Sequence, residues 1–348
     1  MHIPIQNIYY LLSYAWNKLE ESKIVGVQNI RCDTLVDLFA KVLANGISYI
    51  LRRGIDRGYL LHLEETGTLR GKVDFNTTLK RTHFSTPQVY CEYDELNYNV
   101  LHNQILKTTL DKLIRFQELD HAIRADLIFL YRTLKEVELI RLTKRHFGLV
   151  QLHSNNAFYD LLLHICELIH ENLFVSEEDG TSKFRDFVRD EKKMAALFEA
   201  FVRNFYKHEQ NTFIVSRENI AWNARPLNED SHGFLPIMQT DISLTSSTQK
   251  IIIDTKYYVE ALQTYHEKGS IRSLHLYQMH AYMNNLPASE KARLACEGIL
   301  LYPKVQEDLD LKYEFPEYQL RVKTIDLSQP DWKDICKDLL NMIGVEKS

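Results

Sequence analysis

Two short segments decide the fold of this chain: QTDISL at residues 239–244 and IIIDTKYY at residues 251–258. The second begins with three β-branched isoleucines, and the first continues an alternation of apolar and polar side chains from Met238 to Leu244. Both patterns are typical of strands. Residues 246–249, between the two segments, are all polar and suit the loop of a β-hairpin. We therefore expect a hairpin here.

This hairpin would bring two aspartates together. If residues 246–249 form the loop, Thr245 faces Lys250, and counting outward places Asp241 opposite Asp254. Directly opposed residues have Cβ atoms roughly 5 Å apart, which is close enough for two carboxylates to bind one divalent cation. Lys256 lies two residues beyond Asp254 and therefore projects from the same face. Two aspartates and a lysine so arranged are typical of metal-dependent nucleases of the PD-(D/E)XK type.

The same pattern has a simpler interpretation, because Asp-x-Lys on a strand is usually a solvated pair of charges. Two observations favour a metal site. Asp254 follows three isoleucines, so its strand is expected to be covered on both faces, where an unpaired carboxylate is costly. The predicted register of the hairpin also places Asp241 opposite Asp254 without any inserted or deleted residue. Composition and spacing alone leave both interpretations open.

Length and charge limit the function. The 348 residues are enough for two domains, each with its own core. The formal net charge is −5, from 42 basic and 47 acidic residues, so no general basic field indicates nucleic-acid binding. If the chain meets DNA, it does so through a local patch or with the help of a partner.

Cysteine usage and hydropathy indicate a compartment. The five cysteines are scattered and include no Cys-x-x-Cys, which favours reduced thiols over a disulfide framework or a zinc knuckle. The first residues do not resemble a signal peptide, and no apolar run approaches the roughly 20 residues of a membrane span. We expect a cytoplasmic protein without membrane contact.

The order of predicted elements indicates a mixed fold, α+β or α/β. An N-terminal domain over residues 1–175 is predicted to be helical, with a small β-subdomain inserted at about residues 59–95. The polar residues 176–182 are the best candidate for a linker. A C-terminal domain over residues 183–348 is predicted to begin with an amphipathic helix and to continue with strands, a helix and further strands. This αβββαβ order is that of a restriction-endonuclease-like core.

Three further residues are candidates for supporting the two aspartates. Gln278 and Tyr282 stand at positions i and i+4 of a predicted helix that follows the hairpin, where they could orient Lys256 or a scissile phosphate. Glu199 lies beside the apolar stripe of the preceding helix and is a possible further acidic group. The alternative is an ordinary helix surface in each case.

The segment GTLRGK at residues 67–72 resembles a phosphate-binding loop but has one residue too few between its glycines, and Val73 follows where Ser or Thr is needed. The chain is therefore not expected to hydrolyse a nucleotide. Arg70 and Lys72 instead give the β-subdomain a basic character that is usable for docking a partner. Ordinary surface charge is the alternative.

Several segments together resemble the McrC family, the nuclease subunits of the McrBC modification-dependent restriction systems. The resemblance spans nearly the whole chain and rests on five stretches in order: residues 3–16 (IPIQNIYYLLSYAW), 71–75 (GKVDF), 103–110 (NQILKTTL), 186–194 (DFVRDEKKM), and Thr240-Asp241 with DTKYY at 254–258.

The resemblance implies a type IV restriction endonuclease subunit with a fixed division of labour. The N-terminal half would insert into a ring of the McrB-type AAA+ GTPase and stimulate it, and the C-terminal half would cut DNA with Mg²⁺. Asp241, Asp254 and Lys256 match the catalytic residues of the family, whereas Glu199 does not carry over safely. The two aspartates would hold the Mg²⁺, and Lys256 would stabilise charge on the phosphate. The partner would read the methylated base and bring the DNA.

Two other functions stay open from the sequence. A non-catalytic adaptor would stimulate the GTPase through a decayed nuclease fold, but the intact set of Asp241, Asp254 and Lys256 argues against it. A stand-alone nuclease would leave the N-terminal half unexplained. Since one active site cuts one strand, double-strand cleavage is expected to need a second copy of the chain.

Overall fold

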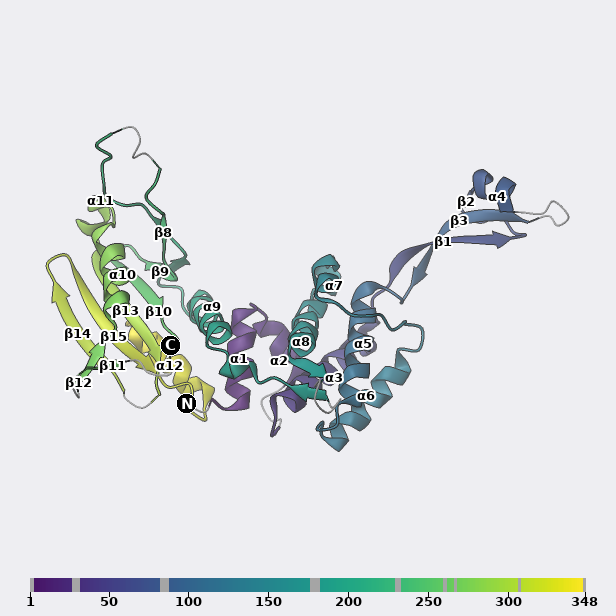
Figure 1. The fold of residues 1–348 in the computed structure, drawn as a ribbon, viewed down its shortest axis with the longest axis horizontal. Helices are drawn as coiled ribbons and strands as arrows, with labels where there is room; N and C mark the ends of the chain where they lie inside the picture. Colours follow the sequence, from purple (N-terminus) through teal and green to yellow (C-terminus); the bar gives the residue numbers. More distant parts are fainter. Residues whose placement is uncertain are drawn as a thin grey trace. The chain divides into compact units, whose positions relative to one another are not determined.

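The computed structural model shows two compact units, each described by itself below: residues 20–185, and residues 1–19 together with residues 186–348 (Figure 1). The structure describes residues 3–26, 32–81, 88–175, 182–228, 233–258, 262–265, 268–305 and 308–346. The predicted linker at residues 176–182 lies mostly outside this described part. No helix in these ranges is both long enough and apolar enough to cross a lipid bilayer.

Helices form the body of the unit of residues 20–185. They are α2 (Leu19–Val25), α3 (Leu35–Arg53), α5 (Leu101–Arg115), α6 (His121–Thr133), α7 (Lys144–Leu149) and α8 (Phe158–Asn172). The longest, α3, begins where the Thr34 hydroxyl accepts a hydrogen bond from the Asp37 amide, and it ends at Gly54 with φ 100°. A Cβ at Gly46 would lie 2.4 Å from Leu162, so this glycine lets α3 approach α8 closely.

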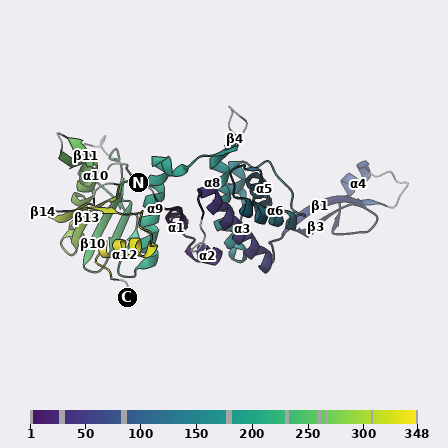
Figure 2. The same ribbon diagram turned by 90° about the horizontal axis from the view of Figure 1, so that it is seen from below.

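A three-stranded antiparallel sheet interrupts these helices in the region predicted for the β-subdomain. It consists of β1 (Gly58–Thr66), β3 (Val89–Asn97) and β2 (Lys72–Val73), in the order β1-β3-β2, with the short helix α4 (Phe75–Arg81). We call residues 58–97 the β-arm, because its strands extend away from the helices of the same unit (Figure 1, Figure 2). Gly71 turns the chain with φ 58°, where a Cβ would lie 2.3 Å from the Glu92 carbonyl oxygen.

The other unit is built on a six-stranded mixed sheet in the order β14-β15-β13-β10-β9-β6. The strands are β6 (Ile214–Ser216), β9 (Ile242–Thr245), β10 (Gln249–Thr255), β13 (Ala295–Pro303), β14 (Asp310–Phe315) and β15 (Tyr318–Ile325). Strand β10 pairs antiparallel with β9 and parallel with β13, which in turn pairs parallel with β15.

Helices cover both faces of this sheet. On one face, α10 (Ser273–Asn284) packs its Met279 and Tyr282 into a cluster that contains Ile252 of β10. Ile251 and Ile253 point to the other face, where α9 (Glu191–Glu209) contacts β10 and α12 (Trp332–Met342) contacts β15. All three isoleucines are fully buried. Strand β10 is therefore covered on both faces, as its composition predicts.

The first helix, α1 (Ile5–Ala15), packs with the C-terminal elements, although the sequence-based boundary assigned it to the N-terminal domain. The Asn7 amide donates hydrogen bonds of 2.9 and 2.8 Å to the carbonyls of Leu327 and Gln329. The ring of Tyr10 stacks on Trp332 with centroids 4.9 Å apart. These contacts join residues that are more than 300 positions apart, so no local pattern reveals them.

The predicted strand over residues 238–244 is broken in two. Its first part, β8 (Met238–Gln239), pairs with β7 (Asn219–Ile220), and β9 begins only at Ile242. Between them, the Thr240 amide donates to the Glu218 carbonyl at 2.9 Å, and its hydroxyl accepts from the Glu218 amide at 2.9 Å. Thr240 therefore belongs to neither β8 nor β9, and the chain bends at Asp241.

The remaining elements are short. They are β4 (Leu173–Val175), β5 (Ser182–Phe184), β11 (Leu262–Tyr265), β12 (Lys268–Ile271), α11 (Ala288–Lys291) and the 3-10 turns η2 (Ser154–Asn156) and η3 (Phe187–Arg189).

Candidate active site

The hairpin of β9 and β10 has the register that its sequence predicts. Lys250 pairs with Thr245, and the ladder continues to Ile253 opposite Ile242. The next residues in each direction are Asp254 and Asp241. The two aspartates therefore lie at the same end of the hairpin.

Asp254 is fully buried. Its Oδ2 lies 2.8 Å from the Nζ of Lys256, whereas its Oδ1 has no hydrogen-bond partner among the described residues. Burial raises the pKa of Asp254 to about 7, the charge of Lys256 opposes this rise, and the charges of Asp241 and Glu199 add to it. Without a cation, the carboxyl group is therefore only partly ionised at neutral pH.

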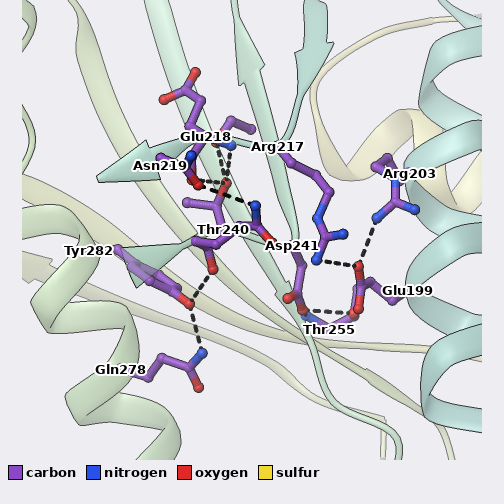
Figure 3. A network of polar contacts seen from close by, with 12 residues as sticks. Glu199, Arg203, Arg217, Glu218, Asn219, Thr240, Asp241, Thr255, Gln278 and Tyr282 are labelled. Atoms are coloured by element: carbon purple, nitrogen blue, oxygen red, sulfur yellow. Dashed lines mark hydrogen bonds and ion pairs between the residues drawn. The ribbon is translucent and has the colours of Figure 1, made fainter. Parts of the chain in front are cut away.

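Asp241 is oriented by the backbone of the facing strand. Its Oδ2 accepts hydrogen bonds from the Thr255 amide at 2.9 Å and from the Thr255 hydroxyl at 3.0 Å (Figure 3). Thr240, which is fully buried, holds the bend on the other side through its bonds to Glu218. The second carboxylate is therefore fixed at the end of β10 rather than exposed on a mobile side chain.

A chain of hydrogen bonds supports Lys256 from helix α10. The Lys256 ammonium donates to Gln278 Oε1 at 3.0 Å, Gln278 Nε2 donates to the Tyr282 hydroxyl at 2.7 Å, and that hydroxyl donates to the Gln239 carbonyl at 2.8 Å. Figure 3 shows the Gln278 amide pointing to Tyr282 and the Tyr282 hydroxyl pointing to the backbone beside Thr240. The structure thus brings Gln278 and Tyr282 together with Lys256. Gln239, which completes the chain through its backbone, was not anticipated from the sequence.

Glu199 reaches the same region from helix α9. It accepts from Arg203 at 2.7 Å and lies 3.3 Å from the guanidinium of Arg217. Its contribution to the raised pKa of Asp254 reflects its proximity to that carboxylate. Sequence reasoning missed both arginines. Arg203 stands four residues after Glu199, a spacing that predicts such a pair, whereas nothing local indicates Arg217.

The docking candidates Arg70 and Lys72 lie elsewhere. Both are exposed and belong to the β-arm, which is part of the unit of residues 20–185. They are not among the residues around Asp254.

The donor set fits a hard divalent cation. Asp254 Oδ1 is a buried oxygen that none of the described residues hydrogen-bonds, and Asp241 offers its other oxygen at the same end of the hairpin. Among the described residues, no group of three or more His, Cys, Asp or Glu side chains is arranged to hold a metal. An ion here would complete its shell with water, backbone carbonyls or phosphate oxygens. This set suits Mg²⁺, which usually keeps several waters beside one or two carboxylates.

Comparison with known proteins places the chain in a family. Residues 6–303 match the sequence profile of the McrBC 5-methylcytosine restriction system component family. The type IV methyl-directed restriction enzyme EcoKMcrBC of Escherichia coli K12 is 30% identical over 340 residues, which cover 98% of this chain and 97% of the relative. The chain belongs to this McrBC family.

A solved structure shows the same overall fold. It is the half-complex from a tetradecameric assembly of Thermococcus gammatolerans McrB AAA+ hexamers with bound McrC. The match has a TM-score of 0.62 at 18% identity and covers 98% of this chain and 76% of that one. At this identity the likeness concerns the mixed α/β fold alone.

Proposed function

We propose that this chain is the Mg²⁺-dependent DNA endonuclease subunit of a GTP-dependent, methylcytosine-directed restriction complex. The observation that carries the proposal is the fully buried Asp254, whose Oδ1 has no hydrogen-bond partner in the described part of the chain, at the hairpin end that also holds Asp241 and Lys256. A buried carboxylate with an orphaned oxygen is costly unless it has a ligand. The membership of the McrBC family supports a role in restriction.

The residues have distinct tasks in a PD-(D/E)XK mechanism. Asp254 and Asp241 would hold the cation. A bound Mg²⁺ polarises the scissile phosphate and lowers the pKa of a coordinated water. Lys256, fixed by Gln278, would place its ammonium next to the phosphate, where negative charge develops during cleavage. Tyr282 would keep Gln278 in the orientation that holds the lysine.

The β-arm is the proposed docking surface for an McrB-type AAA+ GTPase ring. Seven of its large apolar side chains are between 47% and 74% exposed: Tyr59, Leu61, Leu63, Leu69, Phe75, Leu79 and Leu96. Tyr59, Leu61 and Leu63 share one face of β1, and Leu96 lies opposite Tyr59. An exposed apolar strand face of this kind is typical of an interaction site. Arg70 and Lys72 would add positive charge to this arm.

The charge of the chain supports dependence on this partner. Proteins that hold DNA by themselves generally use clusters of Lys and Arg, whereas this chain has 42 basic and 47 acidic residues. We propose that the partner reads the methylated base and delivers the DNA, and that two copies of this chain cooperate to cut both strands.

A reconstituted cleavage assay tests the proposal. The purified chain is combined with plasmid DNA and Mg²⁺, with or without the GTPase, GTP and cytosine methylation. Cleavage is expected only when all components are present, and not with Asp254→Ala. Efficient cutting of unmethylated DNA by the chain alone would show a self-sufficient nuclease. GTPase stimulation without any cleavage would show an adaptor.

A further inference from the structure

Arg217 is a basic group at the candidate site that has no part in the mechanism above. It follows β6 directly, and because Ser216 pairs with Ser243, the same register places it opposite Ile242, the residue after Asp241. Figure 3 shows the Arg217 side chain extending toward Glu199 and passing close to Asp241.

Arg217 is not needed to neutralise Glu199. Arg203 already binds the same Glu199 oxygen at 2.7 Å and is only 18% exposed, whereas Arg217 lies at 3.3 Å and is 44% exposed. An ion pair this exposed contributes little to stability, because water screens the two charges. The guanidinium of Arg217 can therefore turn away while Glu199 keeps a partner.

Two other described cations near the aspartates are already engaged. Lys256 is 15% exposed and bonds both Asp254 and Gln278, and Arg203 holds Glu199. The proposed Mg²⁺ would balance Asp241 and Asp254 at the scissile phosphate, and Glu199 is paired with Arg203. The phosphates that flank the scissile bond would still attract a cation that is able to turn toward them, and Arg217 is exposed enough to do so. A guanidinium suits this task because its planar fork binds two phosphate oxygens at once.

We infer that Arg217 is a substrate-contacting residue that leaves Glu199 and binds a backbone phosphate of the cleaved strand beside the scissile bond. This inference rests on the proposed nuclease function and adds to it a residue that binds the phosphate backbone of the substrate. Arg203 retains Glu199 during the exchange. The contact involves only the backbone, so it carries no base preference.

The test uses the full-length chain with three substitutions at this position and a matched control. Arg217→Ala removes the cation, Arg217→Gln keeps a hydrogen-bond donor for Glu199, and Arg217→Lys keeps the charge without the fork. Arg293→Ala removes the same charge from an exposed position before β13, whose first residue pairs with Gln249 at the opposite end of β10. Thermal unfolding checks that each variant is folded.

Two readouts separate phosphate contact from a structural role. The first is the single-turnover cleavage rate of the complex with GTPase, GTP and methylated DNA, which should fall roughly 10- to 100-fold for Arg217→Ala and Arg217→Gln. The second is binding of a short methylated DNA duplex to the same complex in Ca²⁺ at several salt concentrations. The slope of log affinity against log salt should decrease by about 1 in both variants, because one fewer counterion is released.

The control and the lysine variant sharpen the result. Arg217→Lys should keep the salt slope of the wild type but not its full cleavage rate, and Arg293→Ala should keep its rate. The inference is wrong if Arg217→Ala and Arg217→Gln fold and match the wild type in rate and salt slope, or lose rate with an unchanged slope. In either case cleavage by the wild type leaves the nuclease function standing. If the wild-type complex neither binds nor cuts DNA, the proposed function fails and this inference fails with it.

Discussion

The ammonium of Lys256 lies 2.8 Å from Oδ2 of Asp254, two residues earlier on the same face of the chain, and the aspartate is completely buried. The pair satisfies only one side of the carboxylate, since Oδ1 has no partner among the described residues. Such a buried carboxylate pairs with one cation through one oxygen, while its other oxygen has no hydrogen-bond partner among those residues. A divalent ion that binds to that second oxygen would stabilise the carboxylate further. This relationship has consequences for cleavage, for pH and for stability.

Replacing either aspartate should abolish cleavage without unfolding the protein. Asp254→Ala and Asp241→Ala each remove a proposed metal ligand. Replacing a residue that only supports a metal ligand typically costs about 10- to 100-fold in activity, so we expect the loss of a ligand itself to lower DNA cleavage at least about a hundredfold. Stimulation of the partner GTPase should remain. The exposed Asp310, which pairs with Lys323 on β15, supplies a control substitution to Ala. Nicking by Asp254→Ala at the wild-type rate would contradict the assignment.

Lys256 and Gln278 should behave as one unit. Lys256→Ala removes the charge that opposes the rise in the pKa of Asp254, so cleavage should be lost and Mg²⁺ binding should require a higher pH. Gln278→Ala leaves the lysine without its helix contact and should lower kcat about 10- to 100-fold with little effect on DNA affinity. The double variant should be no worse than Lys256→Ala alone. Additive losses, measured in single-turnover assays, would separate the two residues.

The pH dependence of stability should reveal the buried carboxyl group. The pKa of Asp254 is about 7 in the folded chain and 3.8 as its ordinary value. Between these values the folded state holds a proton that the unfolded chain has released. This group therefore makes the metal-free protein less stable as pH rises from about 4 to 7, by at most about 4 kcal/mol.

Asp254→Asn should remove this dependence, as measured by denaturant unfolding in EDTA at several pH values. His275, whose pKa is lowered to about 4 by burial, gives an opposite slope but is present in both proteins, so the difference between them isolates Asp254. Mg²⁺ should stabilise the wild type at pH 8 and should not stabilise the Asn variant. Equal pH profiles for the two proteins would rule out the buried, shifted carboxyl group.

The exposed face of the β-arm should determine coupling to the partner. Leu61→Ser with Leu63→Ser makes that face polar while leaving a folded chain, because both side chains are already largely exposed. GTPase stimulation should fall about tenfold or more at a fixed concentration of the chain. Leu149→Ser, at an exposed position on α7, is the control. Normal stimulation by the double variant, measured as phosphate release, would place the docking surface elsewhere.

Local patterns explain why the hairpin and its supporting helix could be anticipated. A strand has a side-chain period of two, and a polar loop sets the register, so Asp241 and Asp254 follow from counting. Lys256 projects on the face of Asp254 for the same reason. Gln278 and Tyr282 are one helical turn apart, which makes their mutual contact predictable.

Other features depend on contacts between distant parts of the chain. The sequence does not indicate that the strand breaks at Thr240, because the break depends on Glu218, 22 residues earlier. The packing of α1 on the C-terminal unit depends on carbonyls near residue 328. Arg217 lies beside Glu199 because β6 pairs with β9, and no spacing along the chain encodes that pairing.

By itself, the sequence determined the family, the residues of the hairpin and the types of groups at its end. Periodicity and motif identity are properties of residues that are neighbours in the chain, so both can be recognised without a structure. Only the tertiary structure decided that Asp254 is buried with one oxygen that no described residue hydrogen-bonds, that Asp241 is held by Thr255, and that the exposed Arg217 pairs with Glu199. Burial, pKa and pairing depend on which side chains meet in space, and that is set by packing of strands and helices from distant parts of the chain.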